Sequence, residues 1–107
     1  IKARIYRKNQ KICGFEIPVT QDAQAGEDIV CSAVTVLCFN TVNAVEKFTD
    51  IPFKADVDEK RGGYLKLVSL EGMEDHDTQL LLKTLVMGLS DIALEYKNYL
   101  TLIHEEV

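Results

Sequence analysis

Residues 26–39 read GEDIVCSAVTVLCF, and this stretch predicts the first helix of the fold. Asp28 resembles a helix N-cap, because its short side chain can accept a hydrogen bond from a backbone N–H of the first turn. Apolar residues then recur at helical spacing from Val34 to Val45. This assignment places Cys31 in the first turn, at the third helical position.

Two strand patterns precede this helix. Residues 2–8 and 11–17 alternate between apolar and polar side chains, and the two residues between them are typical of a hairpin. In the second strand Cys13, Phe15 and Ile17 share one face, so Cys13 is expected in the core. The chain therefore enters the helix from a β-hairpin.

Further strand and helix patterns follow. The predicted elements are strands at 52–57, 64–69 and 99–103 and a second helix from 78 to about 96. Asp77 is the expected cap of that helix, and Phe53, Ala55 and Val57 are expected to face inward. The order ββαββα with a final short strand predicts a single two-layer α+β domain over residues 1–107, in which two helices cover one face of an antiparallel or mixed sheet.

The composition is that of a soluble globular protein, with 47% hydrophobic and 27% charged residues. A net charge of −5 argues against direct nucleic-acid binding, which needs clustered lysine and arginine. We find no uninterrupted apolar run near the roughly 20 residues that span a bilayer, so no membrane partner is expected. Three cysteines without paired spacing argue against a disulfide framework and favour a cytoplasmic location.

His76 is the residue that most suggests a metal site, because it lies among acidic residues at 74–77. No second histidine or cysteine lies at ligand spacing in the sequence, so we interpret this stretch as a solvated turn. His104, near the last residue, is expected on the surface. The sequence predicts neither a metal site nor a cofactor.

Cys31 has two interpretations. A helix N-terminus stabilises negative charge through its unpaired N–H groups and its dipole, and the thiolate is the nucleophilic form of cysteine. Cys31 is therefore a candidate nucleophile if it is exposed in a cleft. Free cysteines are also among the most often buried residues, so a Cys31 covered by its neighbours is a small core side chain.

Several stretches, in the right order along the chain, resemble the ribosomal-processing cysteine protease family. They are Gly26-x-Asp28-Ile29-Val30-Cys31-x-Ala33-Val34-Thr35, and the segments at 40–46, 62–66, 79–85 and 94–96. The resemblance implies a cysteine endopeptidase that removes a short N-terminal extension from a large-subunit ribosomal protein, with Cys31 as the nucleophile. It also implies a homodimer whose partner is the N-terminal peptide of that ribosomal protein.

The chain departs from the family pattern at the general base. The family carries a histidine twelve residues before its cysteine, and that position is Val19 here, or Thr20 when the alignment runs forward from Gly14. Thr20 cannot accept a thiol proton near neutral pH. The family's serine four residues after the cysteine is Thr35, which keeps the hydroxyl group.

Three explanations are open for the missing histidine. The chain is a catalytically impaired homologue that binds a peptide without cutting it, or further residues belong between Pro18 and Gly26, or a distant histidine acts on Cys31. Asp28 is predicted to support the site, either as the helix cap or by orienting a base from that loop. Thr20 and Gly26 are predicted to belong to the loop that contacts the substrate.

Overall fold

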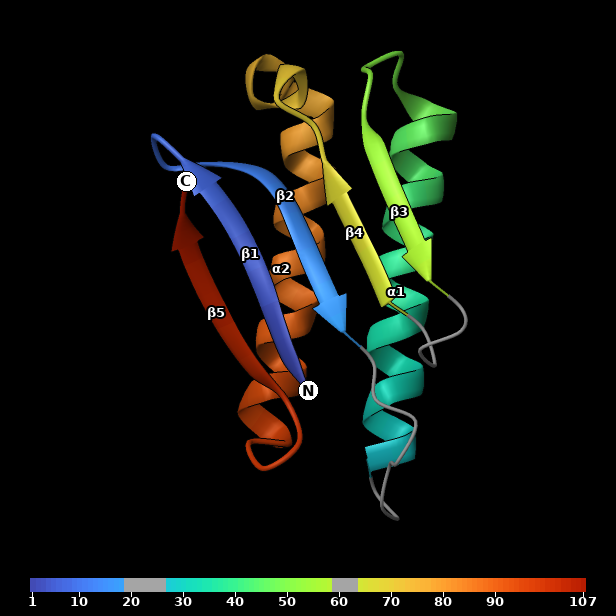
Figure 1. The fold of residues 1–107 in the computed structure, drawn as a ribbon, viewed down its shortest axis with the longest axis vertical. Helices are drawn as coiled ribbons and strands as arrows, with labels where there is room; N and C mark the ends of the chain where they lie inside the picture. The colour runs from blue at the N-terminus through green and yellow to red at the C-terminus, as the bar shows by residue number, and fades with distance from the viewer. Residues whose placement is uncertain (19–26, 59–63) are drawn as a thin grey trace.

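The computed structural model describes residues 1–18, 27–58 and 64–107. The elements are β1 (Lys2–Lys8), β2 (Lys11–Pro18), α1 (Glu27–Phe48), β3 (Lys54–Asp58), β4 (Tyr64–Val68), the 3₁₀ helix η2 (Glu71–Glu74), α2 (His76–Glu95) and β5 (Thr101–Glu106). Figure 1 shows one twisted five-stranded sheet with both long helices, running in opposite directions, on one side of it. The predicted α+β fold with two helices on one face is confirmed.

The sheet is mixed, in the order β3-β4-β2-β1-β5. Neighbouring strands are antiparallel except β1 and β5, whose pairing is parallel and runs from Lys2 opposite Thr101 to Arg7 opposite Glu106. The last strand of the domain therefore lies beside the first. In the hairpin between β1 and β2, Asn9 and Gln10 both have positive φ, the backbone geometry that a two-residue turn between twisted strands requires.

The core lies between the sheet and the helices. The strands contribute every second residue to it, as their alternation predicts, and each helix contributes one stripe. Its fully or nearly fully buried side chains include Ala3, Ile5, Phe15, Ile17, Leu65, Leu67, Val30, Val34, Cys38, Leu82, Leu85 and Leu89. Gly88 allows the helices to approach closely, because a Cβ atom there would lie 3.2 Å from Cδ1 of Leu37.

A β-bulge corrects the prediction for Cys13. Tyr6 pairs with Gly14 but Arg7 pairs with Ile12, so β2 carries one extra residue opposite β1 at this point. The extra residue reverses the alternation, and Ile12 joins the core in place of Cys13. The Cys13 thiol is still buried, but on the other face of the sheet, where its Sγ donates to the Tyr6 carbonyl at 3.5 Å.

Two other predictions of local structure are wrong. Ala55 and Val57 are exposed on the edge strand β3, not buried, although the register pairs them with the core residues Leu67 and Leu65. The second helix begins at His76 and its N-cap is Asp75, not Asp77. The Asp75 carboxylate accepts hydrogen bonds from the hydroxyl and the backbone N–H of Thr78, and these bonds lower its pKa.

By length and composition alone, residues Ile29–Phe48 of α1 could span a membrane. This was not predicted from the sequence, because only uninterrupted apolar runs were considered. The core helix of a soluble domain passes the same test. Here Val30, Val34 and Val45 are buried against the rest of the domain, so one stripe of α1 forms part of its core.

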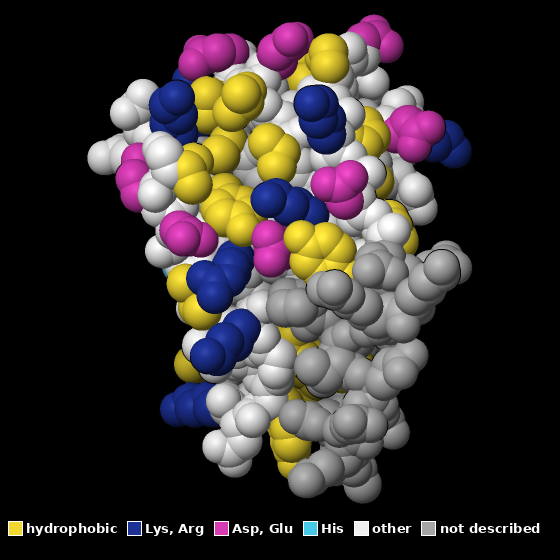
Figure 2. Space-filling model, viewed as in Figure 1, with side chains coloured by type: hydrophobic (Ala, Val, Ile, Leu, Met, Phe, Trp, Pro, Cys, Tyr) yellow, Lys and Arg dark blue, Asp and Glu magenta, His cyan; other side chains and the backbone are white. Residues whose placement is uncertain are grey.

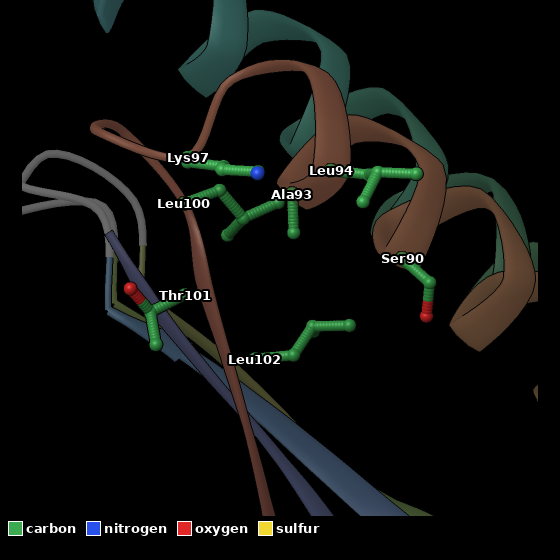
Figure 3. Close-up of a pocket in the computed structure, with 7 residues that line it drawn as sticks. All are labelled: Ser90, Ala93, Leu94, Lys97, Leu100, Thr101 and Leu102. Atoms are coloured by element: carbon green, nitrogen blue, oxygen red, sulfur yellow. The ribbon is translucent and has the colours of Figure 1, made fainter.

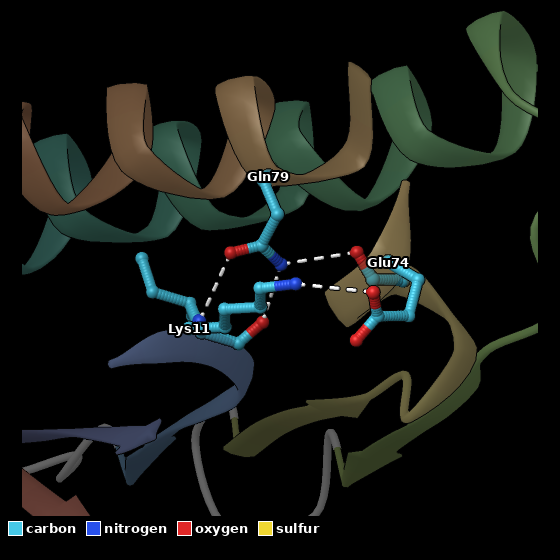
Figure 4. A network of polar contacts seen from close by, with 5 residues as sticks. Lys11, Glu74 and Gln79 are labelled. Atoms are coloured by element: carbon cyan, nitrogen blue, oxygen red, sulfur yellow. Dashed lines mark hydrogen bonds and ion pairs between the residues drawn. The ribbon is translucent and has the colours of Figure 1, made fainter. Parts of the chain in front are cut away.

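The buried Gln79 side chain joins α2 to the bulged end of β2. Its Oε1 atom accepts from the Ile12 N–H at 3.0 Å, and its Nε2 atom donates to the carbonyls of Ile12 at 2.8 Å and Gly72 at 3.0 Å (Figure 4). Beside it, Lys11 and Glu74 form a more exposed ion pair at 3.1 Å. Gln79 thus gives hydrogen-bond partners to the buried backbone N–H and carbonyl of Ile12 and to the Gly72 carbonyl of η2.

Replacing Gln79 with methionine is expected to lower the free energy of unfolding by about 2 to 3 kcal/mol, because the Ile12 N–H and carbonyl lose the Gln79 amide, while the Gly72 carbonyl keeps only the Asp75 N–H. Urea unfolding would measure the loss. Lys11→Met is the matched control, since removing a solvent-exposed ion pair costs less than about 1 kcal/mol. Equal losses in the two variants would contradict the role assigned to Gln79.

Candidate active site

Cys31 lies near the beginning of α1, but not where the sequence predicted. The helix begins at Glu27, one residue before Asp28, so Asp28 is the second helical residue and not the N-cap. Cys31 is consequently the fifth residue of α1, just beyond the first turn. The partial positive charge of a helix N-terminus still acts on this position, although it falls off beyond the first turn.

Cys31 is half-buried, which distinguishes it from a core side chain. On one side of it along the helix surface lie Val30 and Val34, with 1% and 0% of their surfaces exposed. On the other side lie Ser32, which is exposed, and Val36, which is 66% exposed. The thiol therefore lies at the border between the core stripe and the solvent face, anchored by packing yet accessible.

The other two thiols are in different environments. Cys38, two turns further along α1, is 1% exposed, and burial raises its pKa to about 12. Cys13 is 2% exposed on the opposite face of the sheet, and burial raises its pKa as well. Both thiols are buried and ionise less readily than an ordinary cysteine, so Cys31 is the most accessible of the three thiols for nucleophilic chemistry.

This difference predicts the order of alkylation. Cys31 is expected to react with iodoacetamide at pH 7 at least about tenfold faster than Cys13 or Cys38, because it is more accessible and because burial raises the pKa of the other two thiols. Peptide mapping by mass spectrometry after short exposures would give the three rates. Labelling of Cys38 at the rate of Cys31 would show that burial does not protect it and would remove the special status of Cys31.

The other predicted site residues are only partly placed. Thr35 lies four residues after Cys31 on α1 and is also half-buried, so the two side chains are neighbours on one helix face. The backbone of Asp28 lies in the first turn, where a negative charge is favourable. Thr20 and Gly26, the predicted substrate-loop residues, lie outside the described residues, as does Val19.

Neither histidine lies near the beginning of α1. His76 begins α2, which runs antiparallel to α1, so its helix terminus is at the opposite end of the helix layer (Figure 1). His104 is on β5, at the far edge of the sheet from β3, and its Nδ1 accepts from Arg7 Nε at 3.0 Å. The geometry therefore argues against a distant histidine as the base for Cys31.

Three surface hollows are found among the described residues, and Cys31 lines none of them. One lies between the end of α2 and β5, with a volume of about 370 Å³ (Figure 3). A second, of about 420 Å³, lies where β4 ends, and a third, of about 190 Å³, lies over Cys13.

The comparisons with known proteins agree with this geometry. The family model for Cysteine protease Prp matches residues 1–101. The ribosomal processing cysteine protease Prp of Bacillus subtilis (strain 168) is 32% identical over 105 residues, which cover 94% of this chain and 93% of that protein.

Solved structures share the fold. SMU.848 from Streptococcus mutans superposes with a TM-score of 0.88 at 28% identity, over 99% of this chain and 94% of that one. The Staphylococcus aureus protease Prp, solved in complex with a substrate peptide, superposes with a TM-score of 0.90 at 23% identity, over 97% of this chain and 98% of that one. The half-buried cysteine of α1, the fold and the match over nearly the whole sequence lead to one conclusion: the chain belongs to the Prp family of ribosomal processing cysteine proteases.

Proposed function

We propose that this chain is a cysteine endopeptidase that removes the N-terminal extension of a large-subunit ribosomal protein, with Cys31 as its nucleophile. The observation that carries the proposal is the environment of Cys31, the half-buried thiol near the N-terminus of α1 in a family of cysteine proteases. The protein acts as a homodimer in the cytoplasm, where ribosomal proteins are processed. Its substrate extension ends in aromatic residues before the cut.

In the reaction, the Cys31 thiolate attacks the scissile carbonyl to form an acyl-enzyme, and water then releases the acid. Backbone N–H groups at the beginning of α1 are suited to stabilise the oxyanion of each tetrahedral intermediate. Thr35 supports the thiol from the next turn, and Asp28 adds a carboxylate to the first turn. Thr20 and Gly26 belong to the substrate loop.

Proton transfer distinguishes this chain from the family pattern. The sequence has no histidine before His76, and neither His76 nor His104 lies near the beginning of α1, so no histidine among the described residues is placed to take the Cys31 proton. Carboxylates such as Asp28 have ordinary pKa values near 4 and accept a thiol proton poorly at neutral pH. Slow turnover is expected as a result.

A synthetic peptide that spans the extension and the first residues of the mature ribosomal protein tests the proposal. Incubation with the protein should give two fragments from one cut, detected by mass spectrometry, and no cut in a peptide with its aromatic residues replaced by alanine. Fluorescence anisotropy with a labelled copy measures binding separately. Binding without any cleavage would identify the chain as a peptide-binding homologue and contradict the catalytic proposal.

A further inference from the structure

The outer edge of β5 carries backbone groups that the sheet does not use. β5 is the last strand in the order β3-β4-β2-β1-β5, so among the described residues it has a strand neighbour on one side only. On that side the Thr101 N–H donates to the Ile1 carbonyl at 2.9 Å. Backbone groups alternate in direction along a strand, so the N–H and carbonyl groups that point outward are those of Leu102, His104 and Glu106. These groups can pair with one more strand.

A hollow of about 370 Å³ opens beside this edge, between β5 and the end of α2 (Figure 3). Its walls include Ser90, Ala93 and Leu94 of α2 and Leu102 of β5. Leu102 pairs with the core residue Ala3, so its side chain points to the helix side of the sheet. Leu94 is 70% exposed and supplies apolar surface at the rim. The hollow therefore suits a large apolar side chain of a partner.

The edge and the hollow together fit an extended peptide. A strand added to β5 pairs its main chain with the outward groups, and its side chains alternate between the two sides of the sheet. A side chain opposite Leu102 then points to the helix side, over the hollow, where it meets Leu94. In this mode of recognition the main-chain bonds supply affinity, and the hollow selects the side chain.

The charges along this edge change sign from its beginning to its end. Lys97 lines the hollow, and Lys2 lies beside the first residue of β5. The strand ends with Glu105 and Glu106. Figure 2 shows this change at the left of the molecule, with basic side chains over the beginning of β1 and β5 and acidic ones above them. A complementary peptide carries its basic residues near the end of β5.

The acidic end keeps capacity for a basic partner. Glu105 lies 3.7 Å from Arg4, and its side chain remains 46% exposed. Glu106 accepts from a backbone N–H at 3.0 Å, and Arg7 donates to His104. Each carboxylate has about four acceptor positions, so both can bind a further ammonium or guanidinium group.

The hollow also lies at the same end of the helix layer as Cys31. α2 runs antiparallel to α1, so the end of α2 and the beginning of α1 are at one end of that layer (Figure 1). Packed helices lie about 8 to 10 Å apart and an extended chain advances about 3.3 Å per residue, so roughly six residues connect the two places when the chain passes around α2. One peptide can therefore contact both.

We propose that the outer edge of β5 binds the retained part of the ribosomal-protein substrate as an added strand, with a large apolar side chain in the hollow and basic residues beside Glu105 and Glu106. The inference rests on the proposed function and adds a second contact to it. The removed extension is short, so the segment that reaches the edge follows the cut. It runs parallel to β5, from the hollow toward the acidic end.

Hydrogen exchange in the Cys31→Ala variant, which cannot form the acyl-enzyme, tests this contact at single residues. Two synthetic peptides share the extension and the cut. The short one ends just after the cut, and the long one continues for roughly twelve residues, twice the distance to the hollow. The long peptide should slow exchange of the outward amides of Leu102 and His104 at least about tenfold and leave the inward amides of Ile103 and Glu105 unchanged. The short peptide should protect none of them.

His104→Pro removes one outward N–H, and proline is tolerated on an edge strand where the N–H faces solvent. It should raise the Kd of the long peptide by roughly 3- to 10-fold, the loss of one hydrogen bond, and leave the Kd of the short peptide unchanged. His104→Ala loses the same side chain but keeps the N–H, so it is the matched control. Circular dichroism and the short peptide together report that each variant is folded.

Two further comparisons test the hollow and the charge match. Leu94→Ala should weaken binding of the long peptide alone, whereas Met87→Ala, also a truncation of an exposed apolar side chain on α2, should not. A long peptide whose basic residues are replaced by glutamine should bind several-fold more weakly. Equal binding of the two long peptides would overturn the basic partner, and equal effects of the two variants would overturn the hollow as its contact.

The outcomes separate this inference from the proposed function. A long peptide that binds no tighter than the short one, or that protects no amide of β5, would overturn the second contact, while cleavage of the short peptide by the wild type would leave the proposed function standing. Protection of the same amides without peptide, rising with protein concentration, would assign the edge to a second copy and also overturn the proposal. If neither peptide binds, the proposed function and the second contact are both wrong.

Discussion

Peptide cleavage is expected to fall by at least about 10³-fold when Cys31 is replaced with alanine, because the acyl-enzyme cannot form without its nucleophile. Binding of the peptide should remain within a few-fold of the wild type, since the helix terminus and the surrounding surface are kept. The melting temperature should change little, because Cys31 is only half-buried. Single-turnover cleavage followed by mass spectrometry, with anisotropy for binding, would measure both quantities.

Cys38→Ala provides the matched control. It makes the same chemical change on the same helix at a site that is 1% exposed, so it should lower stability by about 1 kcal/mol and leave the cleavage rate close to that of the wild type. If Cys38→Ala abolishes cleavage and Cys31→Ala does not, the nucleophile has been assigned to the wrong thiol. Equal cleavage by Cys31→Ala and the wild type would leave no catalytic role for Cys31.

Phe15→Ala is expected to have the largest effect on stability, about 3 to 5 kcal/mol in the free energy of unfolding. Phe15 is completely buried in β2, between Ile5 of β1 and Leu67 of β4, and its loss leaves a cavity under both helices. A domain of this size is stable by only about 5 to 15 kcal/mol, so much of the native population is lost in mild denaturant. Urea unfolding monitored by circular dichroism would measure the change.

Phe48→Ala is the comparison for this prediction. Phe48 ends α1 with 69% of its surface exposed, so the same deletion of a phenyl ring should change stability by less than about 1 kcal/mol. Losses of similar size in the two variants would show that the central strand is not the main part of the core.

The order of elements could be predicted from the sequence because periodicity reports which side of an element is buried. The incorrect predictions concern residues whose place in the periodic pattern does not match their burial. Cys13 was assigned to the wrong face because a one-residue bulge leaves no clear mark in an alternating pattern. Ala55 and Val57 alternate like core residues and pair with core residues of β4, yet both are exposed on the edge strand. Coverage is a property of the assembled layers, and a local pattern cannot report it.

The site was only partly predictable for a related reason. Cys31 could be singled out because a helix terminus and its thiol are both local features of the sequence. The base could not be found, because it depends on which groups the fold brings beside α1, and neither histidine is among them.

The parallel pairing of β1 with β5 determines when this domain can complete its fold during synthesis. Residues 2–7 leave the ribosome well before their outer partners, residues 101–106, which lie 99 positions further along the chain. Until then β1 is an exposed edge, and an unpaired edge strand is a template for aggregation. Loop closure over nearly the whole chain also slows folding. The nascent protein is therefore expected to depend on chaperones more than its small size suggests, until the final strand emerges and closes the sheet.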